Sequence, residues 1–299
     1  MSAGGPSEAP FLGVGVGLRP IHYGDVLGRR ARVDWFEALS ENYLVPGGRP
    51  PRVLEAVREI APVALHGVSL NVGSVDPLDV RYLDELAALA RRVEPAWISD
   101  HLCWTAVDGV QLHDLVPLPR TEEVVRHVAA RVRRVQEHLG RRIALENAAS
   151  YFAYREDAMS EWDFLAAVIE EADCGLLLDL NNVFVSAHNH GFDATCYLDA
   201  IPAGRVFQIH LAGHSREGPL LVDTHDHPVS EPVWALYAHA LRRLGPVSTV
   251  IEWDDSIPAF EVLEAEAARA RAILESTPGA NLDEPVVDAA RDLATPARA

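Results

Sequence analysis

The chain has 299 residues, a hydrophobic content of 48% and a formal net charge of −18 at pH 7. This length is sufficient for one large α/β barrel or two ordinary domains with a substantial core. The negative charge opposes extended contacts with nucleic-acid phosphates, which require a basic surface.

No apolar run approaches the roughly 20 residues that a membrane-spanning helix needs, because charged residues interrupt each one. The first ten residues lack the basic start and apolar core of a signal peptide. We therefore expect a cytoplasmic protein that binds neither membranes nor nucleic acid.

The three cysteines, Cys103, Cys174 and Cys196, show no metal-type CxxC spacing. Each lies within or beside an apolar segment, so we expect reduced, buried structural thiols. Cys103 follows His101 by two residues and could reach a site there, although the structural role is favoured.

Short apolar or β-branched runs alternate with segments of helical period from residue 11 onward, in eight successive pairs. The predicted strands cover 11–18, 34–39, 62–67, 96–101, 142–147, 175–182, 206–213 and 249–254. Helices are predicted at 78–93, 121–140 and 231–245, and the last two end at Gly140 and Gly245. This pattern predicts an α/β fold of the (β/α)₈ type, the TIM barrel. A doubly wound open sheet shares the alternation, but polar residues at so many strand ends favour closure.

The barrel is predicted to form one metal-binding catalytic domain over residues 11–275, between a flexible N-terminal tail (1–10) and a C-terminal tail (276–299). The GVGVG sequence at 13–17 superficially resembles a nucleotide-binding loop. Because it lies within the first predicted strand, it instead indicates close backbone packing.

Metal-capable side chains follow nearly every predicted strand from the third onward, at the end where this fold builds its active site. In chain order they are His66, His101, Glu146, Asp179, Asn181, Asn182, His210, His214, Asp223, His225, Asp226, His227, Glu252 and Asp254. Burying so many imidazoles and carboxylates in one barrel mouth would be costly without cations. A carboxylate such as Glu146 can bridge two ions, so two or three metal ions fit better than one.

Imidazole and carboxylate ligands without thiolate suit Fe, Mn, Zn or Co, and leave both redox chemistry and hydrolysis open. His188 and His190 follow the sixth predicted strand and could reach the metals, the substrate or only a polar loop. Glu41 and Asn42, after the second strand, also face the predicted mouth and are candidates for holding substrate.

Eight ordered segments resemble the multinuclear non-heme iron-dependent oxidative enzymes, a family that includes the methanobactin biosynthesis oxidase and enzymes of bufferin pathways. They are LSENY, LHGVSLNVGS, SDHLCW, LENAASYF, LDLNNVFVSAHNHGFD, QIHLAGH, DTHDHPV and IEWD. The resemblance runs from about residue 11 to residue 275 and so covers the whole predicted barrel.

This resemblance implies a TIM barrel with two or three iron ions in mixed Fe(II)/Fe(III) states and O₂ as co-substrate. The positions that match the family's metal ligands are His66, His101, Glu146, Asp179, Asn182, His210, Asp223, His225 and Glu252. The implied reaction modifies cysteine in a ribosomally synthesised precursor peptide, which a small partner protein usually presents. Asp254 is the catalytic candidate, either as a proton acceptor or as a residue that orients a metal-bound histidine.

Two other functions fit part of the pattern. A metal-dependent hydrolase or isomerase, of the endonuclease IV or sugar-isomerase type, uses the same barrel and the same ligand types. The similarity to trinuclear zinc endonuclease IV barrels implies a histidine where this chain has Asn182, and this departure favours the oxidase. A non-enzymatic metal carrier is the third alternative.

Overall fold

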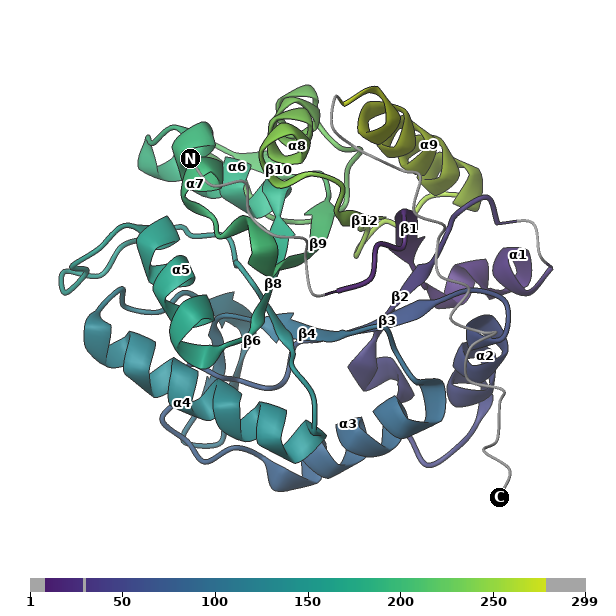
Figure 1. Cartoon of the computed structure of the whole chain (residues 1–299), viewed down its shortest axis with the longest axis horizontal. Coiled ribbons are helices and arrows are strands. Elements are labelled where there is room, and N and C mark those ends of the chain that lie inside the picture. Colours follow the sequence, from purple (N-terminus) through teal and green to yellow (C-terminus); the bar gives the residue numbers. More distant parts are fainter. Residues whose placement is uncertain (1–8, 29–30, 278–299) are drawn as a thin grey trace, which may run out of the picture.

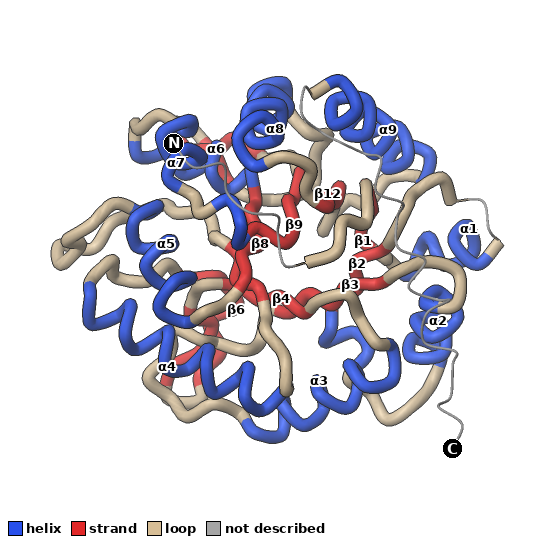
Figure 2. Tube along the Cα trace, in the orientation of Figure 1, coloured by secondary structure: helices blue, strands red, loops and turns tan. Residues whose placement is uncertain are grey.

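The computed structural model describes residues 9–28 and 31–277, and it contains eight parallel strands closed into a barrel. Figures 1 and 2 show the strands as a central ring with the helices outside it. Around the barrel the order is β1 (Val14–Gly17), β12 (Ser248–Ile251), β9 (Val206–Leu211), β8 (Gly175–Asp179), β7 (Ala144–Glu146), β4 (Ile98–His101), β3 (Val63–Gly67) and β2 (Phe36–Leu39). Because β1 pairs with both β2 and β12, the sheet has no edge, and the predicted TIM barrel is confirmed.

The helices surround the barrel as α1 (Tyr23–Leu27), α2 (Arg49–Arg58), α3 (Val80–Val93), α4 (Glu122–Leu139), α5 (Glu161–Ala172), α6 (Leu180–His190), α7 (Ala194–Ala200), α8 (Glu231–Leu244) and α9 (Phe260–Ser276). The three helices predicted from sequence correspond to α3, α4 and α8. The hydroxyl of Thr121 accepts a hydrogen bond from the Val124 amide at the start of α4, and Gly140 follows its end at a φ of 66°. These are typical helix start and stop signals.

The sixth predicted strand, 175–182, extends too far. β8 ends at Asp179 and α6 begins at the next residue. Asp179 is the N-cap of this helix, because its Oδ1 accepts a hydrogen bond from the Asn182 amide at 2.6 Å. Asn181 and Asn182 therefore belong to the first turn of a helix and not to a strand.

The glycines of β1 allow close packing, as predicted. A Cβ added at Gly15 would lie 2.6 Å from the backbone oxygen of Trp35, and closer than van der Waals contact to its ring. All four residues of β1 are buried. The GVGVG sequence thus serves the contact between the first two strands.

Two antiparallel hairpins were not predicted. The first, β5 (Trp104–Val107) with β6 (Val110–Val116), follows β4, and the second, β10 (Ser215–Glu217) with β11 (Leu220–Val222), follows β9. Both follow barrel strands, so they lie at the mouth of the barrel where the metal-capable residues gather.

Cys103 and Cys174 are buried free thiols, as expected, but the prediction for Cys196 was wrong. Helix α7 buries Tyr197 and Leu198 and leaves Cys196 exposed. Among the described helices, none is both long and apolar enough to span a membrane. The predicted tails lie outside the described residues, except for Ala9, Pro10, Ser276 and Thr277, of which Ser276 ends α9.

Candidate metal centre

A cleft of about 680 Å³ opens at the C-terminal ends of the barrel strands. Eight of the ten predicted site residues line it: His66, His101, Glu146, Asn182, Asp223, His225, Glu252 and Asp254. The other two, Asp179 and His210, are fully buried and lie in one compact group with Glu146 and Glu252. The barrel thus brings together side chains that are up to 188 residues apart in the sequence, from His66 to Asp254.

The ligand atoms fall into three overlapping groups, each compact enough to hold a metal ion. The groups are His66, His101 and Glu146; Glu146, Asp179, His210 and Glu252; and His225, Glu252 and Asp254. Glu146 belongs to the first two groups and Glu252 to the last two. Shared carboxylates are the usual bridges between neighbouring metal ions, so the arrangement suits a cluster.

Each of the four histidines is held at one ring nitrogen by a neighbouring group. The contacts are His66 Nδ1 with Ser99 Oγ at 2.9 Å, His101 Nδ1 with the Gly67 carbonyl at 3.1 Å, His210 Nε2 with Glu37 Oε1 at 2.9 Å, and His225 Nδ1 with Asp254 Oδ2 at 3.2 Å. The second nitrogen of each ring then faces the carboxylates of the site. Metal-binding histidines are oriented in this way in proteins.

Several buried ligand atoms have no hydrogen bond among the described residues. They are Glu146 Oε2, Asp179 Oδ2, Asn182 Oδ1, His210 Nδ1 and His225 Nε2. Glu146 Oε2 lies 3.1 Å from His66 Nε2 and 3.2 Å from His101 Nε2, yet makes no hydrogen bond with suitable geometry to either. Buried polar atoms are rarely left unsatisfied, and donors directed at a common point are what a metal ion requires. The residues present therefore fit bound metal ions.

His225 can serve the cluster through either nitrogen. Its Nδ1 lies 3.2 Å from both Glu252 Oε2 and Asp254 Oδ2, but this atom is already hydrogen-bonded to Asp254. Its Nε2 has no hydrogen bond and lies 2.7 Å from Asp223 Oδ1 and 3.7 Å from Asp179 Oδ2. Nε2 is therefore the ring nitrogen that remains available for a metal ion, with Asp223 and Asp179 beside it.

Negative charge dominates this site. Six carboxylates contact the histidines of the site. They belong to Glu37, Glu146, Asp179, Asp223, Glu252 and Asp254. Burial by itself lowers the pKa of His66, but Glu146 and Glu37 outweigh it and raise the pKa to about 9. Burial and the charges of Glu146 and Asp223 raise the pKa of Asp179 well above its usual range. Without cations the site would hold protons, which bound metal ions would replace.

Comparison with known proteins decides the family. The family model of the RiPP precursor modification enzymes MbnB, TglH and ChrH, which act on precursors of ribosomally synthesised and modified peptides, matches residues 13–275. The chain belongs to this family. A UPF0276 protein of Anaeromyxobacter sp. (strain Fw109-5) is 58% identical over 260 residues, which cover 87% of this chain and 92% of the relative. A UPF0276 protein of Acaryochloris marina is 53% identical over 258 residues, covering 86% and 93%.

Solved structures share only the barrel fold with this member of the RiPP precursor modification family. An L-ribulose 3-epimerase has a TM-score of 0.59 at 17% identity, over 88% of this chain and 95% of the epimerase. Endonuclease IV from Thermus thermophilus has a TM-score of 0.57 at 19% identity, over 88% and 98%. These similarities show a shared fold and give no evidence of a shared function.

Other candidate residues of this family member bind neighbouring loops. His188 Nε2 contacts the Pro219 carbonyl at 3.1 Å, and His190 Nε2 contacts Ser150 Oγ at 3.0 Å. His214 pairs with Asn181, and Asp226 pairs with His227. None of these side chains joins the three ligand groups.

The residues predicted to hold substrate after the second strand have other surroundings. Glu41 accepts hydrogen bonds from the Tyr82 hydroxyl at 2.7 Å and from the Val68 amide at 3.0 Å. It therefore holds the loop that follows β3 and does not belong to the residues that line the cleft. Asn42 is exposed on the turn η2 (Ser40–Tyr43).

Three parts of the site were missed. Glu37 had a signal, because a carboxylate stands inside the apolar run of the second strand. Arg19 had no signal in the sequence. Its guanidinium contacts Asp254 and lies 3.9 Å from Glu252 Oε1. The hairpin β5–β6 lines the cleft with Gln111, His113, Asp114 and Leu115.

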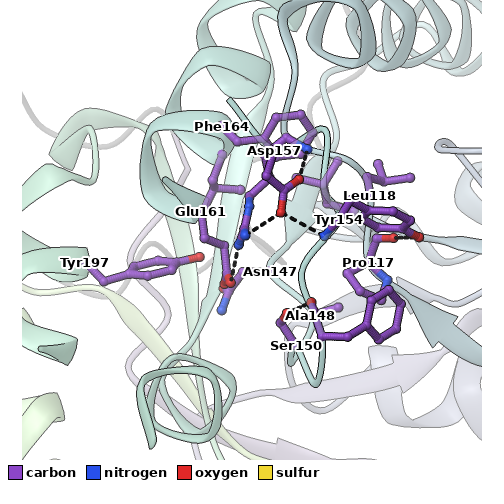
Figure 3. Close-up of a pocket in the computed structure, with 14 residues that line it drawn as sticks. Pro117, Leu118, Asn147, Ala148, Ser150, Tyr154, Asp157, Glu161, Phe164 and Tyr197 are labelled. Atoms are coloured by element: carbon purple, nitrogen blue, oxygen red, sulfur yellow. Dashed lines mark hydrogen bonds and ion pairs between the residues drawn. The ribbon is translucent and has the colours of Figure 1, made fainter. Parts of the chain in front are cut away.

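A second cavity, of about 40 Å³, is lined in part by the loop that follows β7 (Figure 3). Asn147, Ala148, Ser150 and Phe152 of this loop line the second cavity, whereas Ala149 and Tyr151 line the metal cleft. Figure 3 shows Glu161 and Tyr197 at this cavity. Burial raises the pKa of Glu161 to about 7, although Arg120, 3.6 Å away, lowers it.

Proposed function

We propose that this protein is a multinuclear non-heme iron-dependent oxidase that uses O₂ to modify cysteine residues of a ribosomally synthesised precursor peptide. A small partner protein that presents the peptide is part of the proposal. The observation that carries it is the pair of ligand groups that share Glu146, with His225 beside them at Glu252, in a chain of the RiPP precursor modification family.

Three sets of side chains would hold the ions. His66, His101 and Glu146 would hold one ion, and Asp179, His210 and Glu252 a second that shares Glu146. His225 and Asp223, with Asn182 nearby, would hold a third. Bound iron would supply one-electron redox chemistry and would stabilise a substrate thiolate at neutral pH.

The chain's own side chains would orient the ligands and move protons. Asp254 is half exposed to the cleft and hydrogen-bonds His225 Nδ1, so it can hold that ring and accept a proton from substrate. Arg19 forms an ion pair with Asp254 and helps to hold this side chain in place. Tyr151 accepts a hydrogen bond from the Asp223 amide at 3.0 Å, and burial raises its pKa to about 12, so its hydroxyl remains a donor in the cleft.

A metal-dependent hydrolase or isomerase is the second candidate, because imidazole and carboxylate ligands also suit zinc and manganese. The structural neighbours include endonuclease IV and sugar epimerases, at identities that support the fold alone. Metal content separates the two candidates.

The experiment is anaerobic purification followed by elemental analysis and Mössbauer spectroscopy of iron-57-enriched protein after brief exposure to air. If the protein is the proposed oxidase, we expect two to three irons per chain with a coupled ferrous and ferric pair. The Mössbauer signal of this pair should be lost in Glu146→Ala. Stoichiometric zinc or manganese without redox-active iron would overturn the proposal in favour of the hydrolase or isomerase.

A further inference from the structure

Exposed apolar side chains of this protein gather on one face. Among the described residues, ten large apolar side chains are exposed. All except Leu27 lie on a segment that follows a barrel strand, or in the first turn of the next helix. These segments form the C-terminal mouth, so the exposed apolar surface surrounds the metal cleft. Such surfaces often mark interaction sites.

Val75, Val110 and Leu112 form a compact part of this surface, which we call the lip. Their exposed fractions are 74%, 61% and 39%. Val75 lies on the loop after β3, and the other two lie on β6 of the first hairpin. The two segments are adjacent, because Asp76 Oδ2 accepts a hydrogen bond from the Gly109 amide at 3.2 Å.

The lip is firmly held. Asn71 Oδ1 accepts a hydrogen bond from the Thr105 amide at 2.8 Å, and Asn71 Nδ2 donates to the Ala106 carbonyl at 3.0 Å. The buried Arg131 of α4 donates to the carbonyls of Asp76 and Asn71 at 2.7 and 3.2 Å. These bonds tie the loop, the hairpin and α4 together, so the exposure of the lip does not come from a loose segment.

Strand β6 connects the lip to the metal cleft. Gln111, His113, Asp114 and Leu115 line the cleft, whereas the exposed side chains of Val110 and Leu112 do not. From Val110 to His113 the cleft-lining residues alternate with the others in the two-residue period of a strand, and Asp114 departs from it. A register shift opposite Trp104 and Ala106, with His113 at a φ of 55°, marks a bulge in β6. Bulges beside active sites commonly redirect side chains in this way.

A precursor peptide must extend beyond the cleft. A cleft of about 680 Å³ is of the size that takes a drug-sized ligand, which corresponds to a few residues only. Within the described residues β6 pairs only with β5, and the side chain of Asn71 already occupies amide and carbonyl groups of β5. Strand edges of this kind can receive extended peptides. The outer side of β6 is therefore a suitable exit path.

We propose that the lip binds the segment of the precursor peptide that flanks the modified residue, in an extended conformation, with its apolar side chains on Val75, Val110 and Leu112. This inference rests on the proposed function. Residues 104–119 contain Asp108 and Asp114 but no Lys or Arg. The charge of the hairpin therefore favours a flank that is apolar and basic, and not acidic.

The test uses a fluorescein-labelled synthetic dodecapeptide with one central cysteine flanked by Val, Leu and Arg. Its affinity for the anaerobic, metal-loaded protein is measured by fluorescence anisotropy. The lip variant is Val75→Asn/Val110→Asn, which removes the apolar surface without adding charge. The matched control is Ile21→Asn, which changes a side chain of 67% exposure in the 3-10 turn Pro20–His22 after β1. We expect the lip variant to bind at least tenfold more weakly, and the control to bind like the wild type.

A second probe, N-acetylcysteine amide, separates the two proposals because it is too short to leave the cleft. Its binding is followed by thiolate-to-metal absorption, and metal content and circular dichroism verify that each variant is folded. If the small thiol binds but the lip variant holds the dodecapeptide as tightly as the wild type, the lip proposal is overturned and the proposed function stands. If Ile21→Asn lost as much affinity for the dodecapeptide as the lip variant, the lip proposal would also be overturned, in favour of a broad docking face for a partner protein. Failure of the wild type to bind either probe would count against both proposals.

Discussion

Glu37 shows how a single buried charge can organise the site. It is 5% exposed, and its Oε1 lies 2.9 Å from His210 Nε2. Gln208 donates to the other carboxylate oxygen of Glu37 and accepts a hydrogen bond from Trp97 Nε1 at 2.6 Å. This chain of contacts directs His210 Nδ1 at Glu252, 2.8 Å away. A buried carboxylate is weak evidence for stability, but it is typical of a group that orients a metal-bound histidine.

Glu37→Gln should therefore weaken metal binding by about 10- to 100-fold, because the amide keeps the shape but loses the charge that holds His210. The affinity for Co²⁺ would be measured by competition with a chromophoric chelator. Glu85→Gln makes the same chemical change on the exposed face of α3 and should leave the affinity unchanged. Equal affinities of Glu37→Gln and the wild type would show that Glu37 has no part in metal binding.

Glu161 should make the protein less stable as the pH rises. Because its folded pKa is raised from 4.5 to about 7, the folded state binds more protons than the unfolded state in this interval, and the stability falls from about pH 4.5 to 7. The shift corresponds to at most about 3 kcal/mol. Glu161→Gln should be more stable than the wild type at pH 8 and similar at pH 4, by urea denaturation. A loss of stability at pH 8 would instead assign the dominant effect to the ion pair with Arg120.

At the scale of elements, strands β1 and β2 meet through a glycine. Gly15 pairs with Val250 of β12 and has the backbone and ring of Trp35 on its other side. Trp35 is completely buried and contacts Trp97 in an edge-to-face arrangement at 5.3 Å. The ring of Trp35 therefore has little room to move, and this part of the barrel depends on the missing side chain at Gly15.

Gly15→Ala should lower the free energy of unfolding by about 1–3 kcal/mol, because overpacking a rigid core forces backbone shifts. The matched control is Gly24→Ala in α1, where an added Cβ meets no atom within 4 Å. In a helix this change is expected to stabilise by about 0.5–1 kcal/mol. Urea denaturation midpoints would measure both effects. A neutral Gly15→Ala would mean that Trp35 can move aside.

At the scale of the whole molecule, the barrel concentrates negative charge at its mouth. The net charge of −18 and the six carboxylates around the histidines both oppose folding without bound cations. The raised pKa values of His66, His210 and His225 have the same origin, since nearby carboxylates outweigh the effect of burial. Bound metal ions would therefore compete with protons for the same groups.

Removal of the metals should reverse the pH dependence of stability. In the metal-free protein the folded state binds more protons than the unfolded state between about pH 7 and 9, since the folded pKa of His66 is about 9, so the stability falls as the pH rises. In the metal-loaded protein the stability should rise over the same interval, because metal binding requires deprotonated ligands. Thermal unfolding with and without a chelator would measure both slopes. If the stability changed with pH in the same way with and without the chelator, the result would contradict metal binding at this site.

Much of the architecture could be predicted from residue order. Eight alternations of strand and helix are a local signal, because the side-chain periods of 2.0 and 3.6 residues depend only on neighbours in sequence. The ring of candidate ligands followed from the same alternation, since the carboxyl ends of the strands of a barrel all meet at one face. Asp179 was placed at this face, but its capping role ended the sixth strand earlier than predicted.

Contacts between strands that are far apart in the chain were decided only by the tertiary structure. The division of the ligands into three groups joined by Glu146 and Glu252 depends on distances across the barrel. The partnership of Glu37 with His210 spans 173 residues, and that of Arg19 with Asp254 spans 235. The hairpin β5–β6, which was not predicted, is held by Asn71 of the loop after β3, and Arg131 of α4 holds that loop in turn. Local sequence sets which side chains reach the mouth, whereas closure of the barrel sets which of them meet.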